Sequence, residues 1–366
     1  MPVIWTVEAY RAGERGQVKA LVEALGWRNE SKRLNYRLLA FMPHVLGLDT
    51  LRGVTPRTRE LLQPPWPDLV ISSGVRNEPV CRWIRQQSGG RTRYVHVGKP
   101  WAAPDSFDLM VTTPQYRIAD LDNVVQNTLT LHGVTRPQLE QAAANWRDQF
   151  AELPKPHIAV VVGGDSGPFT FGVKAARRLA REASALARES GGSLLVTTSS
   201  RTRPAAADAL RDAIEVPNYF YAWQPNDENN PYFGILGCAD HCVVTADSIA
   251  MLSEACATGK PVVMFDLGGM RPHVSQARDF RLGGSIYRFL LRWCWQPLTR
   301  DITLVHRKLL AAGVVSWLGD APLTPPREAE PGRANADMER AVRAVKNLFG
   351  ELGVPAAVEQ DSPAID

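Results

Sequence analysis

Short apolar segments alternate with segments of helical periodicity along this chain, and the alternation restarts once. In the first half, apolar and β-branched runs bounded by turn residues predict strands at 3–7, 36–41, 69–72, 93–97 and 108–112. Apolar residues at helical spacing predict helices at about 14–26, 76–87 and 136–150.

The second half repeats this pattern. It predicts strands at 157–162, 193–198, 219–222, 243–245 and 262–265, with helices at about 172–189 and 204–214 and a short one that ends at Gly259. Strands that are apolar on both faces and alternate with helices are typical of parallel sheets covered on both sides. We therefore predict an α/β protein with two doubly wound, Rossmann-like domains that face each other across a cleft.

Composition shifts divide the chain into three parts. We place an N-terminal Rossmann-like domain at 1–152, a C-terminal one at 157–320, and a final helix with a partly disordered tail at 321–366. The proline-rich segment 152–156 is the expected linker, which should let the two domains move.

The segment 243–263, VVTADSIAMLSEACATGKPVV, carries the strongest signal of a binding site. Asp247 and Ser248 stand where the strand ends and the helix begins, and unpaired amides at a helix N-terminus favour an anion such as a diphosphate. Glu254 follows six residues after Ser248 and is suited to bind the two hydroxyls of a ribose. Met251 lies between them. The alternative is that Ser248 only caps the helix and Glu254 is solvated.

Three other loops of the second half follow strands and should share this edge of the sheet. Gly163, Gly164 and Ser166 form a turn whose amides and hydroxyl are suited to cradle a phosphate or sugar, although Gly-rich turns are also common as plain structure. In the next loop, Ser199 and Arg201 offer a hydroxyl and a cation for a diphosphate.

Trp223 begins the third of these loops and offers an aromatic face for a base. An ordinary surface loop with a proline turn is the alternative reading of that segment.

In the first half, the loop after the first strand contains Gly13, Glu14 and Gln17. A carboxylate that faces the cleft is suited to act as a general base, so Glu14 is the candidate catalytic residue, with helix-dipole compensation as the alternative. Arg76 follows another strand and is suited to meet an acidic acceptor, while Gln115 and Tyr116 either contact an acceptor or hold the domains together.

Charge and cysteine content narrow the class of protein. The net charge is +4 over 366 residues and the arginines are scattered, which argues against nucleic acid as a partner. The cysteines number 5 and show no paired spacing, so we expect reduced thiols in a cytoplasmic protein; Cys238 and Cys242 straddle a helix–strand junction and predict buried thiols rather than a metal site.

The chain also shows no membrane-spanning run and no charged leader. The segment 286–295 mixes large aromatics with arginines at helical spacing. It predicts either packing between the domains or peripheral contact with the anionic inner membrane.

The segment from Asp247 to Val262, D-S-x-x-M-x-x-E-A-x-x-x-G-K-P-V, resembles the donor-binding segment of GT-B glycosyltransferases. It is called the donor segment below. Further motifs are similar to the family named after the ELM-type mitochondrial fission protein, over roughly residues 1–320: G-E-x-x-Q at 13–17, VHVGKP at 95–100, FDL at 107–109 and TTPQY at 112–116. Where that family usually has a Gly-His pair, this chain has Gly13-Glu14.

This resemblance implies a metal-independent GT-B glycosyltransferase. It would move a sugar from a nucleotide-sugar donor to a glycan or lipid-linked acceptor of the cell envelope, with no cofactor besides that co-substrate. Two alternatives come with the resemblance: a hexosamine 2-epimerase of the same fold, and a non-catalytic binding or scaffold protein related to the mitochondrial fission factor.

Overall fold

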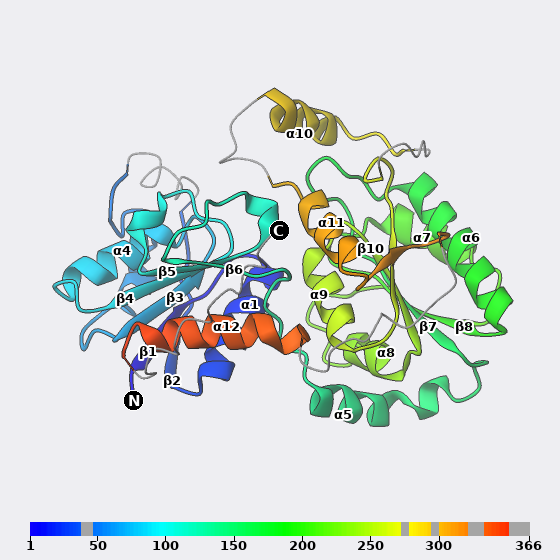
Figure 1. Ribbon diagram of the computed structural model, residues 1–366, viewed down its shortest axis with the longest axis horizontal. Helices are drawn as coiled ribbons and strands as arrows, with labels where there is room; N and C mark the ends of the chain where they lie inside the picture. The colour runs from blue at the N-terminus through cyan, green and yellow to red at the C-terminus, as the bar shows by residue number, and fades with distance from the viewer. Residues whose placement is uncertain (38–46, 272–277, 294–299, 321–332, 351–366) are drawn as a thin grey trace, which may run out of the picture.

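Two parallel sheets of six strands each lie side by side, each covered by helices (Figure 1). The computed structural model describes residues 1–37, 47–271, 278–293, 300–320 and 333–350. Every strand pairing in both sheets is parallel, which confirms the predicted pair of doubly wound α/β domains.

The first sheet has the strand order β2-β1-β3-β4-β5-β6. Its elements are β1 (Val3–Val7), α1 (Ala12–Leu25), β2 (Arg28–Lys32), α3 (Pro56–Arg59), β3 (Leu69–Ser73), α4 (Glu78–Gln87), β4 (Arg93–Val97), η1 (Pro104–Ser106), β5 (Leu109–Thr112), η2 (Pro114–Tyr116) and β6 (Val124–Gln126). Helix α1 ends at Gly26, whose φ of 66° suits a residue without a side chain.

The second sheet has the order β12-β11-β10-β7-β8-β9. Its elements are α5 (Arg136–Trp146), η3 (Asp148–Phe150), β7 (His157–Val161), α6 (Val173–Ser190), β8 (Ser193–Thr197), α7 (Pro204–Asp212), β9 (Asn218–Tyr221), α8 (Tyr232–Cys238), β10 (His241–Thr245), α9 (Ile249–Ala257), β11 (Val262–Phe265), α10 (Leu282–Trp293), α11 (Thr303–Ala311) and β12 (Ser316–Trp317). The last helix is α12 (Arg333–Asn347).

The second strand of the first sheet differs from the sequence-based expectation. The strand is β2 (Arg28–Lys32), which pairs with β1 in full register. Tyr36 of the expected strand 36–41 forms only an isolated bridge with Val54, and 38–46 lie outside the described residues. The sequence RNESK has no apolar residue because β2 is an edge strand, and its residues are exposed or half-buried.

Helix α5, which the sequence analysis grouped with the first domain, packs against α8 of the second (Figure 1). A Cβ on Gly234 would lie 2.3 Å from Cδ1 of Trp146, and one on Gly237 would lie 2.6 Å from the carbonyl oxygen of Leu139. Leu139 also belongs to the core of the second domain. Two glycines on α8 thus allow the two helix backbones to approach closely.

The proline-rich segment 152–156 therefore lies inside the second domain, and the expected hinge there was wrong. Ser193 fixes this segment, because its hydroxyl donates to the carbonyl of Pro154 (2.7 Å) and its amide donates to that of Pro156 (3.1 Å). The chain passes from one domain to the other at 127–135, between β6 and α5.

Helix α12 returns to the first domain and packs beside α1, where Ala341 and Val345 join the core (Figure 1). Its Asp337 carboxylate accepts hydrogen bonds from the amides of Thr128 (3.0 Å) and Leu129 (2.9 Å) in the crossing segment. Thr130 in turn hydrogen-bonds Ser253 on α9 (2.9 Å between hydroxyls). These contacts hold α9 next to the first domain.

Among the helices of the described residues, none is long and apolar enough to cross a bilayer.

Candidate functional site

The strand–turn–helix unit expected at 243–263 is present as β10, α9 and β11. Ser248 is the N-cap residue of α9, yet its side chain makes no capping hydrogen bond. The capping alternative therefore does not account for this hydroxyl. The residue is almost fully buried at the start of the helix, where the helix dipole favours an anion.

Asp247 joins the donor segment to the two other loops. Its buried carboxylate accepts hydrogen bonds from the amide of Gly164 (3.0 Å) and from Nη1 of Arg201 (2.8 Å) through Oδ2. Its other oxygen, Oδ1, is buried without a hydrogen-bond partner. One carboxylate therefore holds the guanidinium of Arg201 at the N-terminus of α9.

Gly163 and Gly164 allow Asp247 and Arg201 to approach the backbone closely, and their amides are not arranged as the expected cradle for a phosphate. The Gly163 amide donates to Oγ1 of Thr245 (2.7 Å), and the Gly164 amide donates to Asp247, so both are already engaged. A Cβ on Gly163 would lie 2.4 Å from Asp247 Oδ2, and one on Gly164 would lie 2.2 Å from the carbonyl oxygen of Arg201. The expected cradle of two free amides is thus wrong, but only glycine fits at both positions.

Hydroxyl groups tie the Arg201 loop to the glycine loop. Ser199 donates a hydrogen bond to the carbonyl of Gly163, and the hydroxyl of Thr202 donates to the same oxygen (2.6 Å). Ser199 is therefore a structural contact within the protein. The Arg201 side chain is 38% exposed, so part of its guanidinium faces solvent.

Trp223 and Met251, also expected at the binding site, differ in how exposed they are. Trp223 is 39% exposed, and its amide donates to Oγ1 of Thr198 (2.8 Å), which fixes the start of its loop beside β8. Met251 on α9 is half-buried against the core. The ring of Trp223 is thus accessible to a ligand.

Glu254 lies in the middle of α9 and is not a solvated helix residue. The hydroxyl of Tyr232 donates a hydrogen bond to its Oε2, and burial raises the pKa of the carboxyl group. The pKa of Tyr232 is raised well above its ordinary value by burial and by Glu254. The carboxylate therefore keeps one oxygen for a second donor.

Glu14 lies in the first turn of α1, and α1 faces α9 across the boundary between the domains (Figure 1). A Cβ on Gly13 would lie 3.9 Å from Cβ of Ala250, which places the start of α1 against α9. The Glu14 side chain is 26% exposed and lies 3.6 Å from Arg11. Burial raises its pKa, against the opposing effect of Arg11 and Arg300.

Gln17 and Arg76 flank this position. Nε2 of Gln17 donates to the carbonyl of Gly13 one turn earlier (3.3 Å). Arg76 is exposed and stacks over the ring of Tyr10, 4.9 Å from its centroid. Both side chains therefore contact the α1 end of the first domain.

Gln115 and Tyr116 hold the two domains together, one of the two roles expected for them. The carbonyl of Gln115 accepts a hydrogen bond from the amide of Asp301 (2.8 Å), and Arg117 forms an ion pair with the Asp301 carboxylate (2.6 Å). The Tyr116 hydroxyl hydrogen-bonds Arg300, and burial raises its pKa.

Two residues near the site were missed from the sequence. The guanidinium of Arg300 donates to the hydroxyl of Ser166, and Nε2 of the buried His306 contacts the carbonyl of Ala246 (2.8 Å), next to the donor turn. Burial lowers the pKa of His306 to about 4, so the ring is neutral and donates from Nε2. No sequence motif marks Arg300 or His306, because both lie far along the chain from Asp247 and Ser248.

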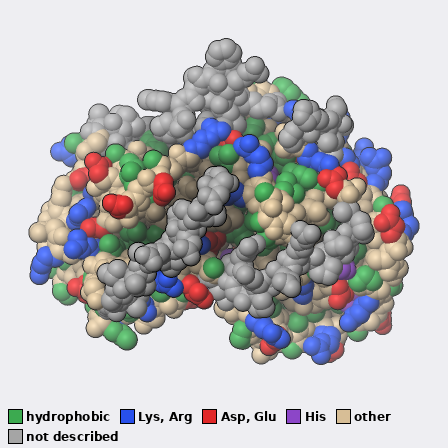
Figure 2. Space-filling view, in the orientation of Figure 1, with side chains coloured by type: hydrophobic (Ala, Val, Ile, Leu, Met, Phe, Trp, Pro, Cys, Tyr) green, Lys and Arg blue, Asp and Glu red, His purple; other side chains and the backbone are tan. Residues whose placement is uncertain are grey.

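Lys and Arg side chains gather along the rim of the hollow between the two domains (Figure 2).

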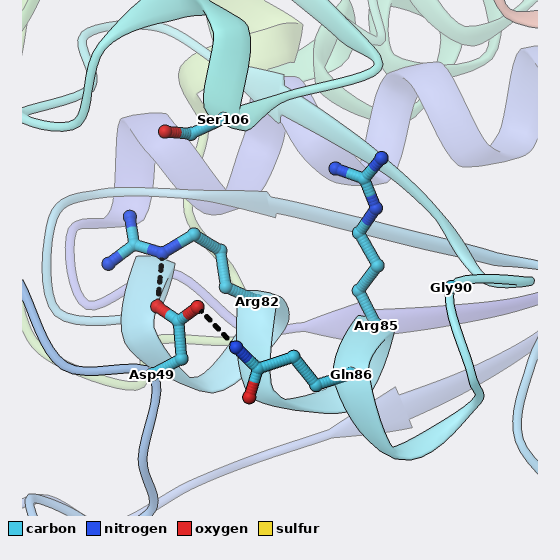
Figure 3. A pocket seen from close by; sticks show the side chains of 6 residues that line it. All are labelled: Asp49, Arg82, Arg85, Gln86, Gly90 and Ser106. Carbon is cyan, nitrogen blue, oxygen red and sulfur yellow. Dashed lines mark hydrogen bonds and ion pairs between the residues drawn. The ribbon is translucent and has the colours of Figure 1, made fainter.

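A separate pocket of about 450 Å³ lies on the first domain beside α4 (Figure 3). Arg82 and Gln86 in that pocket both bind the Asp49 carboxylate (2.5 and 2.8 Å), so these three side chains are partnered with one another.

The family described as Mitochondrial fission ELM1 matches residues 12–284. The Arabidopsis thaliana Mitochondrial fission protein ELM1 is 26% identical over 295 residues, which is 72% of this chain and 69% of that protein.

Two solved structures are similar across nearly the whole chain. The S. aureus MnaA-UDP co-structure has a TM-score of 0.48 at 13% identity and covers 96% of this chain and 98% of its own. A glycosyltransferase from Rickettsia africae ESF-5 has a TM-score of 0.47 at 12% identity, with the same coverage of 96% and 98%. Because the family match spans most of the sequence and includes the start of α1 and the donor segment, the chain belongs to the Mitochondrial fission ELM1 family.

Proposed function

We propose that this protein transfers a sugar from a nucleotide-sugar donor to a glycan or lipid-linked acceptor of the cell envelope, in the cytoplasm. The observation that carries the proposal is the junction at the N-terminus of α9, where Asp247 holds the Arg201 guanidinium beside Ser248. A fixed cation and a helix dipole at one point are what the leaving diphosphate of such a donor requires.

The donor would lie along α9. Arg201 and Ser248 bind the diphosphate, Glu254 accepts from the ribose hydroxyls through the oxygen that Tyr232 leaves free, and Trp223 stacks on the base. The two glycines keep this space open, since side chains there would displace Asp247 and Arg201.

Glu14 is the proposed general base. It takes the proton of the acceptor hydroxyl while that oxygen bonds to the anomeric carbon and the bond from this carbon to the diphosphate breaks. Burial raises its pKa toward the range in which a carboxylate is an effective base near neutral pH. The Arg201 guanidinium, held by Asp247, and the N-terminus of α9 would donate hydrogen bonds to the departing diphosphate, so the proposed transfer calls for no metal ion.

A screen of nucleotide-sugars by thermal shift tests the donor site, because a ligand that binds only the native state raises the unfolding temperature. Product analysis with the ligand so identified then separates the three candidate functions. A glycosylated acceptor supports transfer and an epimerised sugar supports a 2-epimerase. Binding with no product supports a non-catalytic protein.

Peripheral membrane contact belongs to the same proposal. Helix α10 contacts the 163–170 loop of the second domain, since a Cβ on Gly284 would lie 3.1 Å from the carbonyl oxygen of Pro168. On the same helix (Figure 1), Leu282, Ile286 and Phe289 are 67%, 53% and 60% exposed. Arg288 and Arg292 belong to this helix in the sequence, and arginines beside apolar residues suit an anionic bilayer. Residues 294 and 295 of the predicted segment 286–295 lie outside the described residues.

Co-sedimentation with vesicles tests this contact. We expect binding to vesicles that contain anionic lipid, and less binding for Phe289→Ser. Equal recovery of both proteins in the supernatant would exclude α10 as a membrane contact.

A further inference from the structure

Tyr10 and Arg76 lie together at the C-terminal ends of two neighbouring strands of the first sheet. Tyr10 follows β1 and Arg76 follows β3, and these strands pair in parallel. Tyr10 is 75% exposed, and the Arg76 guanidinium lies over its ring, 4.9 Å from the centroid. Arg76 therefore covers one face of the ring and leaves the other open to solvent.

The backbone beneath this exposed pair is fixed by buried contacts. The side-chain amide of Asn77, which is 2% exposed, donates to the carbonyls of Glu8 (3.0 Å) and Ser73 (3.1 Å) and so ties the two strand ends together. Nη1 of Arg15 donates to the carbonyl of Tyr10 (2.8 Å). The positions of the ring and the guanidinium are therefore set before any ligand binds.

Arg76 keeps its charge available. Among the residues that the structure describes, its guanidinium forms no ion pair and no hydrogen bond, and its partner is the Tyr10 ring. Arg11, on the neighbouring turn, lies instead 3.6 Å from the Glu14 carboxylate. Because an aromatic face does not neutralise a guanidinium, Arg76 retains all its donors for an anion.

The turn that carries Arg76 adjoins the proposed base. A Cβ on Gly74, two residues before Arg76, would lie 3.1 Å from Oε2 of Glu14. Gly74 has a φ of 85°, which suits a residue without a side chain. An acceptor whose hydroxyl reaches Glu14 would therefore extend past Tyr10 and Arg76.

We infer that Tyr10 and Arg76 form a subsite for an acidic sugar residue of the acceptor. The apolar face of a sugar ring packs on the open face of Tyr10, and the guanidinium binds a carboxylate or phosphate on the same sugar. Placing this sugar in the acceptor rests on the proposed function, because Glu14 is there the base for the acceptor hydroxyl. Binding of the sugar itself requires no turnover.

NMR titrations of the whole chain with glucose, glucuronate and glucose 6-phosphate at constant ionic strength test the subsite. We expect at least one anionic sugar to bind about threefold or more tighter than glucose, since its charge adds to the packing that all three sugars share. Comparing glucuronate with glucose 6-phosphate distinguishes a carboxylate from a phosphate as the preferred anion.

Two substitutions separate the charge from the ring. Arg76→Gln should remove the preference for the anionic sugar, and Tyr10→Ala should weaken the binding of all three sugars by about threefold or more. Arg136→Gln and Leu121→Ala are the matched controls, because the Arg136 side chain is 90% exposed on α5 and Leu121 is 44% exposed before β6. Both controls should bind the sugars as the wild type does.

Several results would overturn the subsite. They are equal binding of the three sugars, no saturable binding of either anionic sugar, a preference that persists in Arg76→Gln, and wild-type affinity in Tyr10→Ala. Loss of binding in Arg201→Gln but not in Arg76→Gln would place the sugars at the donor site and also overturn it. A failed nucleotide-sugar screen would instead remove the proposed function and leave these titrations unaffected.

Discussion

At the scale of single residues, a few buried polar groups define the site. Asp247 holds Arg201, Tyr232 holds Glu254, and His306 holds the carbonyl of Ala246 beside the donor turn. Each contact fixes a group that would otherwise be mobile or solvated, and burial strengthens such contacts. The sequence analysis named Asp247, Arg201 and Glu254, but not Tyr232 or His306, which contact this segment from other parts of the chain.

Glu254→Ala should weaken nucleotide binding by about 1.5 to 3 kcal/mol, the range for hydrogen bonds to a charged group. Calorimetric titration of the nucleotide found by screening measures the effect. Glu140→Ala is the control, because Glu140 is exposed on α5 and pairs with Arg136. Unchanged affinity in Glu254→Ala would remove this residue from the donor site.

Glu14→Gln should lower turnover by roughly a hundredfold or more and leave donor affinity near that of the wild type, because the amide keeps the shape but not the basic site. The measurement compares the transfer rate and the donor dissociation constant of Glu14→Gln with those of the wild type. Glu23→Gln is the control on the same helix. If Glu14→Gln keeps wild-type turnover, the base is elsewhere, and Asp165 or His96 is the next residue to test.

His306 gives a pH-dependent contribution to stability. Its folded pKa of about 4 lies below the ordinary 6.5, so the unfolded chain binds a proton that the folded chain does not as pH falls below 6.5. Stability is therefore lost toward acid pH, by about 2 kcal/mol from this group between pH 7 and 5.

Urea unfolding at both pH values compares the wild type with His306→Gln, each measured against its own value at pH 7. Asp266 and Asp301 act on this ring and are retained in the variant. The variant should lose less stability between the two pH values. Equal losses would show that His306 is not the titrating group.

At the scale of elements, helix contacts decide which domain a segment joins. Helix α5 packs on α8 through two glycines, and α12 packs on α1 although it follows the whole second domain. Neither choice is visible in hydrophobic periodicity, because an apolar face does not specify its partner. The edge strand β2 was missed for a related reason, since a polar edge strand shows no apolar alternation.

Gly234→Ala should destabilise the protein by about 1 to 3 kcal/mol, because its Cβ would overlap Trp146 on α5 and force the two helices apart. The free energy of unfolding from urea titration measures this. Gly16→Ala is the matched control, since a Cβ there meets nothing within 4 Å and should stabilise α1 by about 0.5 to 1 kcal/mol. Equal stability of the two variants would contradict the α5–α8 packing.

At the scale of the whole molecule, the site is built from both domains and depends on their relative position. Contacts of Asp301 with Arg117, of Arg300 with Tyr116 and of Thr130 with Ser253 join them, while the chain crosses at 127–135. A ligand that contacts both sides of such a boundary favours the closed arrangement.

A bound nucleotide-sugar, whose sugar would lie between α9 and Glu14 of the first domain, should therefore reduce the radius of gyration, with the change arising at 127–135 and not at 152–156. Small-angle scattering with and without a saturating nucleotide-sugar measures this. Limited proteolysis under the same conditions should show protection of the crossing segment. No change in either measurement, with binding demonstrated independently, would exclude domain closure.

The sequence by itself determined the two parallel sheets, because the local periodicity of apolar residues predicts the alternation of strands and helices. It also determined the donor segment, because the residues from Asp247 to Val262 are contiguous in the chain. It also placed Ser248 correctly at a helix start, whereas Glu14, expected in a loop, lies in the first turn of α1.

Only the tertiary structure decided that α5 and α12 pack with the domains they do, that the glycine amides are already bonded, and that Arg300 and His306 reach the site. These features depend on contacts between residues far apart in the chain. Such contacts depend on how the two domains dock, and the spacing of residues along the chain does not predict that docking.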